Sequence, residues 1–271
     1  MQNLAQIFFV MWRETVEAML VVGILHAWLL HHASGKAGIR YLWLGVLMGL
    51  GGALLLGLGI EALSTVLSDE GQEIFQSVLQ FAAAALIVQM VFWMRRNARN
   101  LKKDMEFTLG QRAQEKNWWG VASLAAIAVA REGGETVVFL SSLATGSNSL
   151  ASPTFWIALG LGVVLAALTF YALQLGGKLI SWRLFFKATE TMLLMLACAL
   201  LIGAVERMIG IQIVPALVNQ LWDSSALLED SSVFGGVVSA FTGYRARPSL
   251  TILLVFSAYW AGVRWKLLRS R

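Results

Sequence analysis

Two copies of one charged pattern, Arg-Glu-x-x-Glu, carry the chemistry that this sequence offers. The first copy runs from Arg13 to Glu17, and the second runs from Arg131 to Glu135. Both lie inside long apolar stretches, where a charged side chain that faces lipid costs about 2.5–3.5 kcal/mol. Because six ionisable groups share that cost, we expect both patterns to face a protein interior and to have a function there.

Helix geometry places the three charges of each pattern on one face. At about 100° per residue, two glutamates three positions apart lie about 60° apart, and the arginine lies about 40° from the second glutamate. The arginine can bind one carboxylate in a bidentate manner and hold it ionised, while the remaining carboxylate oxygens stay free. Each pattern therefore predicts two carboxylates and one guanidinium that point the same way.

If the two patterns face each other, their carboxylates form an anionic site made only of oxygen. Four glutamates contribute a formal charge of −4, and two arginines reduce it to −2. Such a site suits a hard cation, and a trivalent ion gains most from it. The predicted metal ligands are Glu14, Glu17, Glu132 and Glu135, with Arg13 and Arg131 organising them.

The composition places these patterns in an integral membrane protein. Of 271 residues, 58% are hydrophobic and only 14% are charged, and the mean hydropathy is +0.68, which is too apolar for a soluble domain. The net charge of +5 comes from basic residues in a few loops, which indicates membrane topology and argues against a nucleic-acid partner. The single cysteine, Cys198, excludes an internal disulfide and a thiolate metal cluster.

Seven stretches of about 20 residues or more are long enough to cross a hydrocarbon layer of about 30 Å. The predicted fold is an all-α membrane protein with seven transmembrane helices in a single permease domain. Charges interrupt the first stretch, so we expect it to remain as a helix and not to be cleaved as a signal peptide. The predicted helices lie near residues 5–30, 41–67, 74–94, 119–144, 154–175, 189–209 and 249–268.

The charges of the loops predict the orientation of the helices. The segments after the third and fifth helices and the C-terminal tail are basic, whereas the loops after the second and sixth helices are acidic. Basic loops belong in the cytoplasm. The N-terminus is therefore expected outside and the C-terminus inside, as an odd number of spans requires.

The spacing of charged residues predicts an inverted repeat. Arg13 and Arg131 are 118 positions apart, and Glu73 and Glu190 are 117 positions apart. Because three helices separate the copies, the two repeats would have opposite directions in the membrane, as in many secondary transporters. The predicted parts are repeat one (about 5–94), a cytoplasmic basic loop (95–118), repeat two (about 119–209), an outer loop (210–248) and a seventh helix (249–268).

Other polar residues are candidates for secondary roles. Asp69 and Glu70 are expected in a solvated outer loop that could raise the local cation concentration. Glu73 and Glu190 are equally compatible with carboxylates at helix N-termini and with a secondary metal site. Three histidines at the cytoplasmic end of the first helix could receive the ion on exit, although such residues more often only mark the interface: His26, His31 and His32.

These features resemble the high-affinity iron permease family, which includes fungal plasma-membrane iron permeases and bacterial EfeU-type permeases. Besides the two charged patterns, the stretches Trp93 to Arg96 (Trp-Met-Arg-Arg) and Gly243 to Ser249 (Gly-Tyr-x-x-x-Pro-Ser) carry the resemblance over essentially the whole chain. The resemblance implies iron import across the plasma or inner membrane, seven spans and the glutamates of the two patterns as iron ligands.

The resemblance also implies an extracytoplasmic partner protein. Fungal members act with a multicopper ferroxidase, and bacterial members act with secreted iron-binding or peroxidase-like proteins. Such partners deliver iron as Fe(III). We therefore expect Fe(III) as the substrate, no cofactor, no enzymatic activity in this chain, and an assembly that is either a monomer or a homo-oligomer.

Three alternatives to iron import stay open from the sequence. The paired charges could be a purely structural ion-pair lock. The same carboxylates could serve a transporter or channel for another heavy or divalent cation, such as Pb²⁺ or Mn²⁺. Seven helices are also the number in receptors and photoreceptors, but the last predicted helix has no mid-span lysine for a retinal Schiff base.

Overall fold

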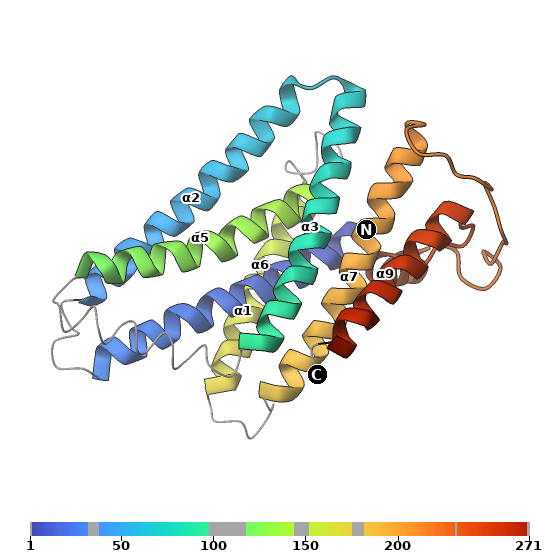
Figure 1. Cartoon of the computed structure of the whole chain (residues 1–271). Coiled ribbons are helices and arrows are strands. Elements are labelled where there is room, and N and C mark those ends of the chain that lie inside the picture. The colour runs from blue at the N-terminus through green and yellow to red at the C-terminus, as the bar shows by residue number, and fades with distance from the viewer. Residues whose placement is uncertain are drawn as a thin grey trace.

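The described part of the chain is built from eight helices and contains no strand. The computed structural model describes residues 2–31, 38–97, 118–143, 152–174, 182–230 and 232–269. The helices are α1 (Gln2–His31), α2 (Gly38–Val66), α3 (Asp69–Asn97), α5 (Trp118–Leu143), α6 (Pro153–Gln174), α7 (Trp182–Gly210), α8 (Val233–Thr242) and α9 (Leu250–Arg269) (Figure 1). Each of the seven long helices overlaps one of the predicted stretches, and the short α8 lies within the predicted outer loop.

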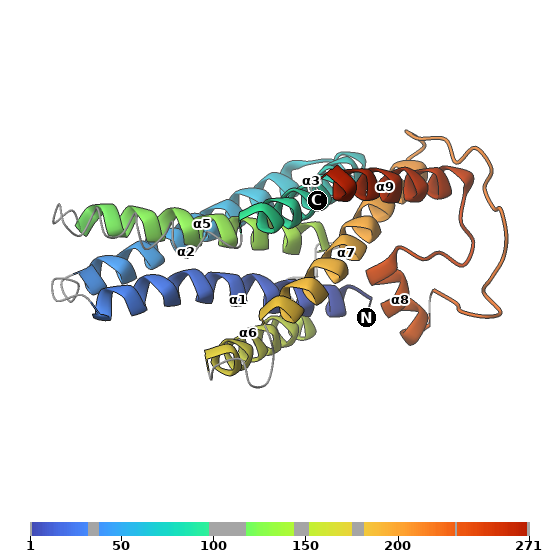
Figure 2. The same ribbon diagram turned by 60° about the horizontal axis from the view of Figure 1, so that its bottom comes forward.

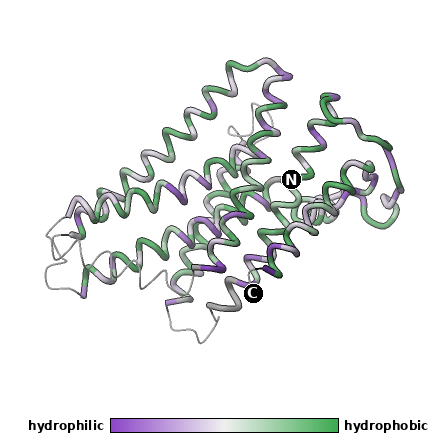
Figure 3. Tube along the Cα trace, in the orientation of Figure 1, coloured by the Kyte–Doolittle hydropathy of each residue, from purple (hydrophilic) through white to green (hydrophobic). Residues whose placement is uncertain are grey.

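The long helices are those of an integral membrane protein. Length and apolar composition suffice for a membrane crossing in four described segments, Gly38–Val66, Asp69–Arg96, Pro153–Ala172 and Lys187–Gly210. Figure 3 shows hydrophobic residues along most of each long helix, with hydrophilic positions interrupting some of them. Large apolar side chains on α2, such as Leu47 and Leu55, are exposed and would be covered by lipid.

The helices pack in pairs that join distant parts of the sequence. α2 lies along α5, α1 lies along α6, and α3 lies along α7 (Figures 1 and 2). The helices that carry the charged patterns, α1 and α5, also contact each other. The first helix of each predicted repeat therefore packs on the second helix of the other repeat.

Glycines allow two of these helix pairs to approach closely. A Cβ atom built on Gly49 of α2 would lie 2.8 Å from the carbonyl oxygen of Ala126 on α5. A Cβ atom built on Gly162 of α6 would lie 3.1 Å from the carbonyl oxygen of Phe8 on α1. Neither position has room for a side chain unless the helices separate, as is common where small residues line membrane helix interfaces.

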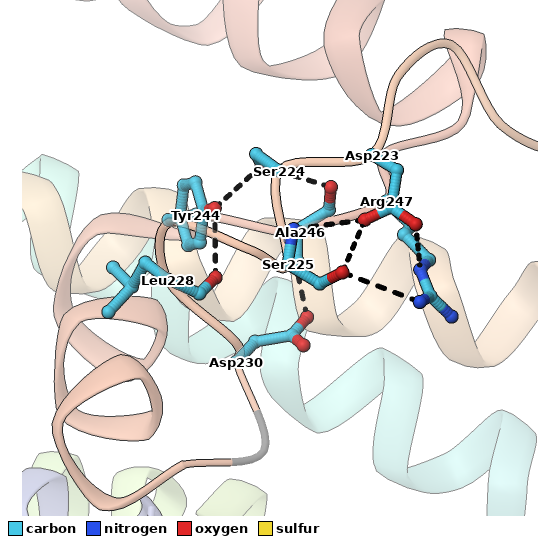
Figure 4. A network of polar contacts seen from close by, with 8 residues as sticks. All are labelled: Asp223, Ser224, Ser225, Leu228, Asp230, Tyr244, Ala246 and Arg247. Carbon is cyan, nitrogen blue, oxygen red and sulfur yellow. Dashed lines mark hydrogen bonds and ion pairs between the residues drawn. The ribbon is translucent and has the colours of Figure 1, made fainter.

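Residues between α7 and α9 are held together by a polar network (Figure 4). The Tyr244 hydroxyl donates to the carbonyl oxygen of Leu228 at 3.0 Å and lies 2.6 Å from the hydroxyl of Ser224. The backbone N–H of Ser224 donates to the carbonyl oxygen of Ala246 at 2.9 Å. These bonds hold the part of the connecting segment before α8 against the part after it.

The same network perturbs Asp223 at its edge. The hydroxyl and the backbone N–H of Ser225 donate to its carboxylate, and the guanidinium of Arg247 donates to it at 2.9 Å (Figure 4). These hydrogen bonds, followed by the charge of Arg247, hold the pKa of the exposed Asp223 carboxyl below its usual range. Asp223 therefore remains an anion that orients Arg247 on this surface.

Two predicted boundaries are wrong. Asp69 and Glu70 form the first turn of α3 and not a loop, because Ser68 accepts a hydrogen bond from the backbone N–H of Gly71 at 3.3 Å and acidic residues favour a helix N-terminus. Helix α7 begins at Trp182 and not near residue 189, so Glu190 lies about two turns inside the helix. Most of the predicted basic loop, residues 98–117, lies outside the described residues.

Candidate metal site

Helices α1 and α5 bring three glutamates of the two patterns together. One carboxylate oxygen from each of Glu14, Glu132 and Glu135 lies within 4.8 Å of the other two. Glu14 is only 2% exposed, Glu135 is also buried, and Glu132 is half-buried. We call these three residues the glutamate cluster. The structure therefore brings the first glutamate of one pattern to both glutamates of the other.

Each glutamate of the cluster has an unsatisfied oxygen. The Oε2 atoms of Glu14, Glu132 and Glu135 are buried and accept no hydrogen bond within the part of the chain that the structure describes. Leaving a charged acceptor buried and unpaired costs free energy, about 1–3 kcal/mol or more. A cation placed among the three carboxylates would supply the positive charge that these oxygens lack.

Arg13 is the buried cation of the site. It is 2% exposed and donates to Oε1 of Glu14 at 2.6 Å, and it forms an ion pair with Glu17 as well. The same guanidinium also contacts the sulfur of Met90 on α3 at 3.0 Å. Glu17 is thus held by Arg13, and it lies outside the glutamate cluster.

Arg131 makes a looser set of contacts in the second pattern. It donates to Oε1 of Glu135 at 3.1 Å, and its guanidinium carbon lies 4.8 Å from the ring centre of Trp93 on α3. Its side chain is 41% exposed. Arg13 therefore joins both glutamates of its own pattern, whereas Arg131 pairs with Glu135 and stacks on an aromatic ring.

The glycines of the second pattern give α2 access to the site. A Cβ atom built on Gly133 would lie 2.7 Å from the Cβ of Ala53 on α2. The first pattern has Thr15 and Val16 between its charges, and Val16 is fully buried against Ala166 of α6. The two halves of the site thus differ in the packing around their carboxylates.

The other predicted site residues lie away from the cluster. Glu73 pairs with Arg207 at 2.8 Å, and Glu190 pairs with Arg95, so the two glutamates join α3 to α7 through ion pairs. Asp69 and Glu70 are exposed at the start of α3.

The described histidines make no contact with the glutamate cluster. The ring of His26 stacks edge-on against Trp43 with centroids 6.2 Å apart, and the Nδ1 atom of the exposed His31 lies 2.7 Å from the carbonyl oxygen of Ala27. His32 lies outside the described residues.

Sequence reasoning noted Glu206, where the resemblance leads one to expect a neighbouring histidine, but it did not connect Glu206 with the two polar residues that the fold brings to it. Glu206 at the end of α7 forms a two-pronged ion pair with Arg245, and Gln80 of α3 lines the same cavity. No spacing in the sequence links these residues, because they come from three separate elements. The interruption of the apolar α7 stretch by Glu206 was the one available signal.

Comparison with known proteins identifies the family of this chain. The sequence model of the Iron permease FTR1 family matches residues 4–268. The chain is 33% identical over 258 residues to the ferrous iron permease EfeU of Escherichia coli O6:K15:H31 (strain 536 / UPEC), covering 93% of this chain and 91% of that protein.

A more distant relative gives the same result. The ferrous iron permease EfeU of Yersinia pestis is 26% identical over 254 residues, covering 93% of this chain and 89% of that protein. No solved structure matches the chain. Because the family match includes both charged patterns and every long helix, the chain belongs to the iron permease FTR1 family of multi-pass membrane transporters.

Proposed function

We propose that this chain imports iron across the plasma membrane through the glutamate cluster between α1 and α5. Two observations carry the proposal: Glu14, Glu132 and Glu135 each bring a carboxylate oxygen within 4.8 Å of the other two, and each has a buried oxygen without a hydrogen-bond donor among the described residues. Oxygen ligands with negative charge are those that a hard cation prefers. Family membership and the names of the relatives make iron the cation.

The arginines set the charge that the ion meets. Four glutamates and two arginines give the two patterns a formal charge of −2, so the site attracts a cation without holding it as strongly as a −4 site would. Arg13 keeps Glu14 in place through a 2.6 Å bond, which leaves the second oxygen of Glu14 for the ion. A transport site must bind the ion and also release it. Because the arginines neutralise part of the negative charge of the glutamates, the ion is released more easily.

Alternating exposure of the cluster would complete the transport cycle. The inverted repeat predicted from the sequence provides two halves that can rock against each other. The packing of the helices supports this repeat, because the first helix of each repeat packs on the second helix of the other: α1 packs on α6, and α5 packs on α2. We propose seven spans with the N-terminus outside, so that the ion passes from the outer side to the cytoplasm.

We propose Fe(III) as the imported ion, on the basis of its charge and of the partner that would deliver it. Fe(III) has the higher charge density and gains more from carboxylate oxygens, and an extracytoplasmic ferroxidase, peroxidase-like or iron-binding partner would supply it. The names of the relatives point to Fe(II), and a divalent ion would neutralise the formal −2. Uptake of ⁵⁵Fe supplied as Fe(III) citrate, compared with uptake under ascorbate, separates the two.

The proposed function is tested by iron uptake in cells that lack their own importers. Glu135→Gln removes one charge from the cluster, and we expect uptake to fall at least about tenfold, equivalent to about 1.4 kcal/mol. Glu61→Gln is the matched control, because Glu61 is an exposed glutamate of α2 outside the cluster. Wild-type uptake by a normally inserted Glu135→Gln protein would contradict the assignment.

Competing metals decide between iron and other cations. If Mn²⁺ or Pb²⁺ suppresses ⁵⁵Fe uptake only at concentrations far above that of iron, the chain is selective for iron. Equal competition would identify a general heavy-metal or divalent-cation transporter that uses the same carboxylates. A protein whose Glu135→Gln variant is destabilised but transports iron normally would instead contain a structural ion-pair lock.

A further inference from the structure

A polar cavity is lined by the C-terminal part of α7, by α8 and by Gln80 of α3. Its volume is about 240 Å³, and α1, α3, α5, α7 and α8 contribute to its walls. Figure 2 shows α8 beside the N-terminal end of α1 and near α7. We call it the α7–α8 cavity, and its polar lining residues are Gln6, Gln80, Glu206, Arg207, Ser239 and Arg245.

The α7–α8 cavity lies in line with the glutamate cluster. On α1, Gln6 precedes Glu14 by eight residues, and on α5, Leu143 follows Glu135 by eight residues. At about 1.5 Å per residue, both helices place the cavity about 12 Å from the cluster along the bundle. In the proposed orientation the cavity is on the outer side.

Gln80 presents an unused acceptor to this cavity. Its side chain is only 8% exposed, and its Nε2 atom donates to the carbonyl oxygen of Ser142 at 3.2 Å. Its Oε1 atom is buried and accepts no hydrogen bond from the described residues. A Cβ atom built on Gly203, one turn before Glu206 on α7, would lie 3.5 Å from this oxygen. The free group is an acceptor, so it can bind a cation or a hydrogen-bond donor but not an anion.

Arg245 covers the carboxylate that would complete such a site. Its Nε and Nη2 atoms donate to the two oxygens of Glu206, each at 2.5 Å. Its Nη1 atom donates to the hydroxyl of Ser239 on α8 and to the carbonyl oxygen of Tyr244. The guanidinium thus occupies the position that a cation would take on Glu206, and it ties α8 to the end of α7.

We propose that the α7–α8 cavity is a second cation site, in which a partly hydrated metal ion binds to Glu206 and Gln80 after displacing Arg245. The proposal rests on the proposed function, because it places this site before the glutamate cluster on the import path. At about 30 Å³ per water, the volume accommodates an ion with about six waters. One carboxylate and one amide oxygen bind more weakly than three carboxylates, so the ion moves on to the cluster.

In this arrangement, binding of a cation to Glu206 is coupled to the separation of α8 from α7. When the ion takes Glu206, Arg245 loses both bonds to α7 while it keeps its bonds to Ser239 and to the backbone of Tyr244. The contact between α7 and α8 through Arg245 is therefore present only without the ion. An ion in the cavity would free this end of the bundle to move.

The test is Mn²⁺ binding to the full-length protein in detergent, followed by the electron paramagnetic resonance signal of free Mn²⁺. Arg245→Gln removes the internal competitor, so we expect Mn²⁺ affinity to rise about threefold or more. Glu206→Gln should lower it. Arg247→Gln, in the same segment but paired with Asp223 and 61% exposed, is the matched control and should leave affinity unchanged.

Glu135→Gln separates this site from the glutamate cluster. In that background Arg245→Gln should still raise Mn²⁺ affinity, and Glu206→Gln should still lower it. If the proposed function is wrong, Glu135→Gln alone will leave Mn²⁺ binding unchanged. Arg245→Lys, which cannot bind both oxygens, should raise affinity in the same direction if Arg245→Gln fails to fold. An affinity that falls or stays constant when Arg245 is replaced overturns the second site.

Discussion

Gly49 of α2 and Gly162 of α6 make the same contact on opposite sides of the molecule. A Cβ atom on Gly49 would meet Ala126 and Val129 of α5, and one on Gly162 would meet Phe8 and Met11 of α1. Both partners on α5 lie 118 positions after their counterparts on α1, which is also the spacing of the two motif arginines. This shared register is what an inverted repeat predicts.

The glycine contacts predict a stability difference between neighbouring positions. Gly49→Leu should destabilise the protein by at least about 1–3 kcal/mol, because the new side chain meets α5 backbone. Gly51→Leu is the control, since nothing lies within 4 Å of a Cβ there. Gly162→Leu and Gly160→Leu form the equivalent pair on α6. Thermal unfolding in detergent measures all four, and equal melting temperatures within each pair would contradict the close approach.

The two motif arginines should differ in their effect on stability. Arg13 is buried and pairs with Glu14 and Glu17, so Arg13→Gln leaves buried carboxylates unpaired and should cost about 3–5 kcal/mol. Arg131 is 41% exposed, and Arg131→Gln should cost about 1 kcal/mol or less. Denaturant unfolding of the purified variants gives both values. A larger loss for Arg131→Gln would refute the asymmetry.

Glu14 and Glu17 should differ in their effect on metal binding, although the sequence treats them alike. Glu14 contributes a free buried oxygen to the cluster, so Glu14→Gln should lower iron affinity by about tenfold or more. Glu17 also pairs with Arg13 but is not one of the three clustered glutamates, so Glu17→Gln should lower affinity less. Equilibrium binding of iron to both variants checks the order, and a greater loss with Glu17→Gln would reverse the ligand assignment.

The ion pairs between α3 and α7 predict rescue by charge exchange. Glu73→Arg should impair the protein because it places a cation against Arg207, which lies 2.8 Å from Glu73 in the native chain. The double variant Glu73→Arg with Arg207→Glu should recover most of the lost uptake. If uptake stays low in the double variant while the protein inserts normally, Glu73 has a role beyond this ion pair.

The sequence was sufficient to predict the long helices and the facing of the two patterns. Apolar length determines the helices in a membrane, and helix periodicity places Arg13, Glu14 and Glu17 on one side of α1. The ends of helices were less predictable. Asp69 and Glu70 have the polarity of a loop, but Ser68 and the helix dipole draw them into α3.

The membership of the cluster depends on tertiary packing that spacing does not encode. The two patterns offer four equivalent glutamates, and Arg13 pairs with both Glu14 and Glu17, yet of these two only Glu14 lies in the cluster with Glu132 and Glu135. The α7–α8 cavity was unpredictable for a related reason, because its lining residues come from five helices and the segment after α8.

The most direct test of the central claim is the position of iron in crystals of the purified protein, located by anomalous scattering at the iron absorption edge. The account predicts one strong peak among Glu14, Glu132 and Glu135, with carboxylate oxygens at about 2.0–2.2 Å, typical of small hard cations. A well-ordered protein with its main iron peak elsewhere, for example beside Glu73 or Glu190, would contradict it.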